Sequence, residues 1–140
     1  MASVTFQIQQ KGFKLNNSKA LKVKLAEIAE KEGCKLEKVN YNFVGDETLL
    51  SINQSFLNHD TFTDIITFDY SYTNAKGLRK LNSEIYISVE RVKENAQKFN
   101  QDFQRELNRV IFHGLLHLCG YTDKTAKDQK LMREKEEFYL

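Results

Sequence analysis

The chain has 140 residues, 41% hydrophobic and 29% charged, with a net charge of +2 and two cysteines. This composition is ordinary for a soluble globular protein, so we expect one domain spanning residues 1–140. No apolar run approaches the eighteen or so residues of a membrane span, and the start of the chain lacks the apolar core of a signal peptide. We therefore expect a cytoplasmic protein with no membrane partner.

The first half of the chain predicts two strand–helix pairs. Residues 4–9 alternate as a strand does, and Asn17 and Ser18 offer an N-cap for a helix that ends near Gly33. Residues 36–43 alternate again and predict a second strand. Gly45 and Asp46 close it, and a helix follows over residues 47–58.

The second half predicts two more strands and three helices. β-branched and aromatic residues over 63–72 predict a strand, and residues 81–89 predict another. Ser88 and Asp102 are N-cap candidates for two helices, and residues 125–139 form a charged closing helix. Mixed in this order, the elements predict an α+β fold with a small mixed β-sheet of about four strands and about five helices.

Three metal-ligand candidates stand near the end of the penultimate helix. His113 and His117 are four residues apart, so on a helix both imidazoles lie on one side. Gly120 is suited to a left-handed helix end, after which Asp123 can turn back toward them. Two imidazoles and a carboxylate leave the fourth position of a tetrahedral zinc open, as catalytic sites do. We expect one Zn²⁺ per chain at His113, His117 and Asp123, at the end of a buried central helix.

The spacing of His113 and His117 also fits packed core histidines or a zinc-protease signature. Histidines in an apolar helix are often packed residues with one hydrogen bond each, although two unpaired imidazoles would then be costly to bury. The spacing also matches a zinc-protease signature, but those enzymes need a Glu directly after the first His as general base. Here that position is Gly114, so a metalloprotease would lack its base.

Three blocks of the chain resemble the YbeY family of metal-dependent endoribonucleases. Residues 113–121 read His-Gly-Leu-Leu-His-Leu-Cys-Gly-Tyr and resemble the family's His-Gly-x-Leu-His-Leu-x-Gly-Tyr signature. Residues 60–68 are similar to its Asp-x-Pro-Thr-Asp-Val-Leu-Ser-Phe block, and residues 83–88 to its Gly-Asp-Ile-x-Ile-Ser strand. The blocks share the family's order and spacing over roughly residues 36–140.

The resemblance implies a zinc-dependent endoribonuclease that is specific for single strands and acts in ribosomal RNA processing. It implies hydrolysis by a metal-activated water or with help from the RNA 2′-OH, and partners that include single-stranded RNA, ribosomal RNA and the small ribosomal subunit. His113, His59 and Asp64 are its catalytic candidates. Asp64 could orient a metal-bound histidine or cap the turn before its strand. The basic residues that would then hold RNA phosphates are Lys14, Lys22, Lys24, Lys76, Arg79 and Lys80.

The chain departs from the family at two positions. Asp123 stands where the family usually has its third histidine ligand, and Asp is a competent zinc ligand. Leu57 stands where the family has an Arg implicated in activity, with His59 close enough in sequence to take part of that role. A non-catalytic ribosome-associated module with a structural metal is the alternative, although structural zinc usually has four protein ligands.

Overall fold

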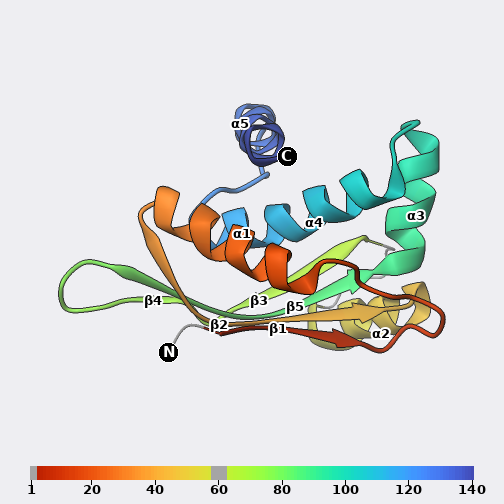
Figure 1. The fold of residues 1–140 in the computed structure, drawn as a ribbon, viewed down its shortest axis with the longest axis horizontal. Helices are drawn as coiled ribbons and strands as arrows, with labels where there is room; N and C mark the ends of the chain where they lie inside the picture. Colours follow the sequence, from red (N-terminus) through yellow and green to blue (C-terminus); the bar gives the residue numbers. More distant parts are fainter. Residues whose placement is uncertain (1–2, 58–62) are drawn as a thin grey trace.

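The computed structural model describes residues 3–57 and 63–140, and in these ranges it contains a five-stranded mixed sheet and five helices (Figure 1). The elements in chain order are β1 (Ser3–Ile8), α1 (Ser18–Lys31), β2 (Cys34–Val44), α2 (Asp46–Leu57), β3 (Ile65–Asp69), β4 (Tyr72–Thr73), β5 (Arg79–Ser88), α3 (Val89–Lys98), α4 (Phe103–Leu118) and α5 (Ala126–Tyr139). The expected α+β fold is confirmed.

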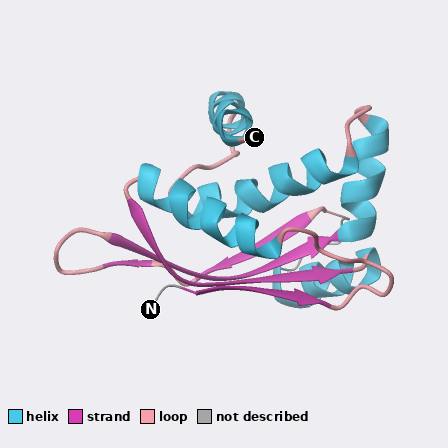
Figure 2. Ribbon diagram, in the orientation of Figure 1, coloured by secondary structure: helices cyan, strands magenta, loops and turns pink. Residues whose placement is uncertain are grey.

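The sheet has the order β1-β2-β5-β3, with β1, β2 and β5 parallel and β3 antiparallel to β5. β4 pairs with the start of β5 in a hairpin that projects from the body of the molecule (Figure 2). Helices α1 and α4 cover one face of the sheet, α2 lies on the other, and α5 lies outside α4 (Figure 1). Among the described helices, none has both the length and the apolar content to cross a membrane.

The main core lies between the sheet and helices α1 and α4. Tyr41 and Phe43 of β2 and Ile85 of β5 are fully buried there, and the Tyr41 hydroxyl donates a hydrogen bond of 3.0 Å to the Ile111 carbonyl of α4. Gly114 brings α4 close to the sheet, because a Cβ at this position would lie 3.0 Å from Ile65 Cδ1. The expected buried central helix is therefore α4, and its polar side chains point away from the sheet contact.

Two helix N-caps agree with their sequence signals, and one agrees only in position. Asn17 precedes α1, but it has a φ of +59° and its side chain forms no capping hydrogen bond. Ser88 accepts a hydrogen bond from the Arg91 amide, and Asp102 accepts one from the Arg105 amide, so both N-caps are confirmed. Gly120 has a φ of +113°, the backbone region that suits glycine after the end of α4.

One strand differs from its prediction. The stretch expected as a single strand over residues 63–72 forms β3 and, after an interruption, the two-residue β4. At the interruption the Ser71 amide donates to the Asp69 carboxylate at 2.9 Å, which bends the backbone out of the ladder. The strand expected over residues 36–43 extends farther at both ends in the structure, where β2 runs from Cys34 to Val44.

The cap at Ser88 gives a direct test of how β5 is joined to α3. Ser88 is fully buried, and its Oγ accepts from the Arg91 amide at 3.1 Å and donates to Asp46 Oδ1 at 3.0 Å. Ser88→Ala removes both bonds and should lower the free energy of unfolding by about 1–2 kcal/mol in urea denaturation. Ser55→Ala on the exposed side of α2 is the control, with an expected change within about 0.5 kcal/mol. Equal effects of the two variants would show that the cap contributes nothing.

Candidate functional site

A cavity of about 600 Å³ lies where β3, α4, the end of α2 and the segment after α4 meet. All three expected metal ligands, His113, His117 and Asp123, line it. Asp64 borders the same cavity at the start of β3, and Leu57 borders it at the end of α2. The structure therefore brings the expected ligands together with Asp64 and with the position at which the family resemblance expects an Arg.

Helix α4 supplies a polar row to this cavity from an otherwise buried surface. Arg109, His113 and His117 follow one another at intervals of four residues and all line the cavity. Side chains four apart on a helix are neighbours on one face, roughly 6 Å apart. The apolar residues between them pack into the core, which fixes the direction in which the polar row points.

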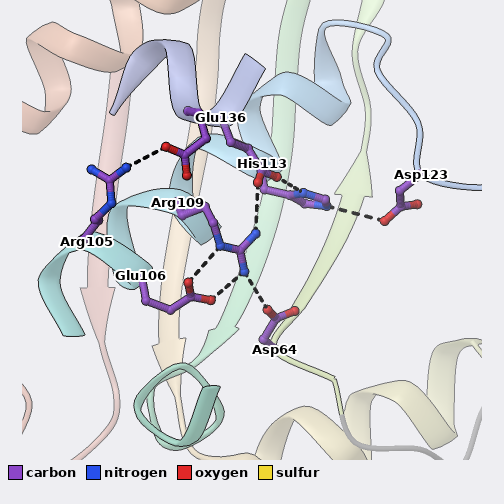
Figure 3. Close-up of polar contacts among 8 residues, drawn as sticks. Asp64, Arg105, Glu106, Arg109, His113, Asp123 and Glu136 are labelled. Atoms are coloured by element: carbon purple, nitrogen blue, oxygen red, sulfur yellow. Dashed lines mark hydrogen bonds and ion pairs between the residues drawn. The ribbon is translucent and has the colours of Figure 1, made fainter. Parts of the chain in front are cut away.

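The two ring nitrogens of His113 face two different carboxylates (Figure 3). Nδ1 lies 2.6 Å from Glu136 Oε2 of α5, and Nε2 lies 3.7 Å from Asp123 Oδ2. Burial raises the pKa of Glu136, but the hydrogen bond from His113 and the charge of Arg109 outweigh it and hold that pKa below its ordinary value. An ionised Glu136 can only accept a hydrogen bond, so the proton of this bond lies on Nδ1, and Nε2 is the nitrogen that faces Asp123 and the cavity.

Arg109 is surrounded by carboxylates at the centre of the site (Figure 3). Its guanidinium lies 2.5 Å from Glu106 Oε2, 3.1 Å from Glu136 Oε1 and 3.9 Å from Asp64 Oδ2. The hydrogen bond to Glu106, above the other contacts, raises the pKa of Arg109, so the guanidinium stays charged despite its burial. Because the side chain of Glu136 is only 2% exposed, Arg109 and His113 are what make its buried charge tolerable.

Asp64 contacts Arg109, and among the described residues it has no hydrogen bond to a histidine. Burial raises the pKa of Asp64, while the charges of Arg109 and His113 act in the opposite direction. Its backbone carbonyl accepts from the Ser88 amide at 2.9 Å, which fixes the start of β3 beside β5. The carboxylate that orients His113 is therefore Glu136.

Asp123 is free to act in the site because another residue caps α5. The N-cap is Thr125, whose hydroxyl accepts from the Asp128 amide at 3.1 Å. Gln129 donates to the Asp123 carbonyl at 3.0 Å and so holds the turn. The Asp123 side chain is 57% exposed and lies at the cavity.

The donors at the cavity are of the kinds that bind zinc. Within residues 3–57 and 63–140, no group of three or more His, Cys, Asp or Glu side chains is placed to hold a metal ion. Two ligands of one tetrahedral zinc lie roughly 3.3 Å apart, and the 3.7 Å between His113 Nε2 and Asp123 Oδ2 is close to that. In the same described ranges the His117 side chain forms no hydrogen bond or ion pair, so its ring is available as the third donor.

The expected RNA-binding residues lie elsewhere, since none of the six borders this cavity. Arg79 donates to the Leu118 carbonyl at 2.7 Å and pairs with Asp69 at 3.2 Å, so it secures the end of α4. Lys22 and Lys24 lie over the rings of Phe6 and Tyr139. The other three of these six expected RNA-binding residues are Lys14, Lys76 and Lys80. His59 lies outside the described residues.

Arg109 and Glu136 are the site residues that sequence reasoning missed. Arg109 carries a local signal, because it precedes His113 by four residues on the same helix face. Glu136 carries none, because it reaches His113 from a different helix, 23 residues later in the chain.

The family model described as Endoribonuclease YbeY matches residues 3–140. The chain belongs to the YbeY family. A curated relative named Endoribonuclease YbeY from Flavobacterium johnsoniae is 46% identical over 125 residues, covering 89% of this chain and 86% of that protein. One of the same name from Amoebophilus asiaticus is 40% identical over 139 residues, covering 99% and 92%. The solution structure of a Thermotoga maritima protein matches with a TM-score of 0.63 and 36% identity, covering 96% of this chain and 85% of that one.

Arg109→Met tests the balance of buried charge in this YbeY-family site. The change leaves the buried carboxylates of Glu106 and Glu136 without their cation, so we expect a loss of about 3–5 kcal/mol at neutral pH in urea denaturation. Arg105→Met is the matched control one turn earlier, where an exposed pair with Glu137 should contribute at most about 1 kcal/mol.

The loss in Arg109→Met should also depend on pH. Glu136 has its pKa lowered in the folded protein, so the stability it contributes is present above the pKa of an unfolded glutamate, about 4.3, and is lost as the pH falls through the lower folded value. The difference between wild type and Arg109→Met should therefore shrink as the pH drops below about 4. A difference that stays constant down to acid pH would contradict an ionised Glu136.

Proposed function

We propose that this chain is a zinc-dependent endoribonuclease that cleaves single-stranded RNA in ribosomal RNA processing. The observation that carries the proposal is the match of residues 3–140 to the Endoribonuclease YbeY family, with curated relatives of that name 40–46% identical over most of the chain. The cavity that holds His113, His117 and Asp123 supports it with a suitable donor set. On the family resemblance, the proposal also includes the small ribosomal subunit as partner and the cytoplasm as compartment.

His113, His117 and Asp123 would hold the zinc ion. When bound, zinc polarises a phosphoryl oxygen and lowers the pKa of a water toward neutrality. Glu136 keeps the proton of His113 on Nδ1, so that Nε2 is the donor presented to the cavity. The buried apolar residues of α4 fix the face of the helix from which the two histidines project.

Asp64 is the candidate for moving a proton in the reaction. It borders the same cavity, and burial raises its pKa toward the range in which a carboxylate accepts a proton from a weak acid. The proton comes from a water or from the RNA 2′-OH, depending on which oxygen attacks the phosphorus. His59 stays a further catalytic candidate from the sequence. Outside the cavity, the candidates for phosphate contacts are Lys14, Lys22, Lys24, Lys76, Arg79 and Lys80.

The geometry disfavours the two alternative functions. A metalloprotease needs a base at position 114, but this position faces the sheet, with Ile65 and Ile85 side chains 3.0 and 3.2 Å from a built Cβ. A structural metal site is closed by four protein ligands, whereas here a cavity of about 600 Å³ lies in front of the donors. Room for a substrate beside the ligands supports catalysis.

Metal content and RNA cleavage together test the proposal. The purified protein should contain about one zinc per chain by elemental analysis and should cleave a labelled single-stranded RNA but not its duplex, with cleavage abolished by a chelator. His117→Ala should reduce metal content to less than about a tenth and cleavage by more than roughly a hundredfold. Asn108→Ala, elsewhere on α4, is the control and should keep both. Full cleavage by His117→Ala would reduce His117 to a packing residue.

Asp123 is tested by two substitutions with opposite expectations. Asp123→Asn should weaken zinc affinity by roughly tenfold or more, because the amide is neutral, while Asp123→His should retain affinity through an imidazole donor. Thermal unfolding without metal should differ little between the two variants, because Thr125 and not Asp123 caps α5. Unchanged zinc affinity in Asp123→Asn would remove this residue from the site and favour the non-catalytic module.

A further inference from the structure

A groove between α4 and α5 leads away from the candidate site. Next to the main cavity lies a second one of about 370 Å³, which shares Arg109, His113 and Asp123 with it and is otherwise lined by α5. A third, of about 150 Å³, continues along the same two helices and shares Arg109 and Arg133 with the second. The three cavities thus lie one after another along α4 and α5, each sharing lining residues with the next.

The charges along this groove divide into a paired interior and unpaired cations at its edge. Glu106 and Glu136 are paired with Arg109, and Glu137 pairs with Arg105 at 2.6 Å. Lys130 and Arg133 of α5 are exposed, and within residues 3–57 and 63–140 neither forms an ion pair or a side-chain hydrogen bond. They are three residues apart, so their side chains leave the same face of α5 about 5–6 Å from each other.

We propose that this groove binds the RNA backbone on one side of the cleavage point, with Lys130 and Arg133 contacting its phosphates. The proposal rests on the proposed function, because the groove opens onto the cavity where the phosphodiester would react. Flexible cationic side chains contact phosphates without reading sequence, which suits a strand that must slide into register with the site. Lys130 and Arg133 line the groove, whereas neither of the two basic segments singled out from the sequence borders the site cavity or this groove.

Binding at several salt concentrations tests the contacts. The probe is a labelled single-stranded RNA long enough to span groove and site, with a chelator present to prevent cleavage. Lys130→Ala/Arg133→Ala should raise Kd by roughly tenfold and lower the salt dependence of log K by about 1.4, since each single-strand phosphate contact contributes about 0.7. Lys93→Ala/Lys127→Ala removes the same charge from exposed positions outside the groove and should leave the slope at the wild-type value. Equal slopes in the two double variants would overturn the proposal.

Two further measurements separate binding from damage to the fold. Lys130→Arg/Arg133→Lys keeps both charges and should keep the wild-type slope. If its slope falls as much as that of the alanine pair, charge is not responsible and the proposal fails.

A dinucleotide substrate, too short to reach the groove, should be cleaved equally by wild type and by the alanine pair, whereas kcat/KM for the long RNA should fall about tenfold in the alanine pair. If wild type cleaves RNA and the alanine pair matches the control on both substrates, the groove proposal fails and the proposed function stands. If wild type neither binds nor cleaves RNA, the proposed function fails as well.

Discussion

The buried carboxylate of Glu136 is the group on which the candidate site depends. It comes from α5, and it lies against Arg109 and His113 of α4 with almost no exposure to water. An isolated buried carboxylate would cost several kcal/mol, so the helix pair is stable only where both partners are in place. The same bond that stabilises this packing holds the proton of His113 on one ring nitrogen. The position of α5 and the chemistry of His113 are therefore fixed by one interaction.

A second carboxylate also fixes the position of α5. Glu32, which follows α1, accepts hydrogen bonds from the hydroxyls of Tyr121 and Tyr139 and from Lys135 at 3.2 Å. Burial raises the pKa of Glu32, but these donors outweigh it and lower the value, so the carboxylate is ionised. Because Tyr121 belongs to the segment that leads to Asp123, this contact holds both the last helix and the third ligand candidate. The site thus depends on contacts that begin at the end of α1.

Features that depend on neighbouring residues could be predicted from the sequence, and contacts between distant segments could not. The caps at Ser88 and Asp102 and the glycine at the end of α4 follow from local backbone chemistry. The spacing of His113 and His117 places both on one helix face for the same reason. The bond from His113 to Glu136 depends on how α5 packs, and the charged pattern of residues 125–139 indicates only a solvated helix, with no sign that one of its carboxylates is buried. The split of the strand over 63–72 also depends on one side chain, Asp69, bonding locally.

The charges that line the site cavity explain why the metal-ligand candidates and the groove between α4 and α5 would act together on RNA. Arg109 is the only arginine among the described residues that line the main cavity, and its charge is already shared by Glu106, Glu136 and Asp64. Leu57, at the position where the family resemblance expects an Arg, adds no charge. Among the described lining residues, the carboxylates of Asp64 and Asp123 outnumber the guanidinium of Arg109, so the sum of these three charges is negative and disfavours a phosphodiester. On the proposed function, a divalent cation on the donors would reverse that sign locally, and Lys130 and Arg133 of α5 would attract the rest of the strand. On the proposed function, the metal ion would hold the reacting phosphate, while Lys130 and Arg133 would bind the neighbouring phosphates whether or not the metal is present.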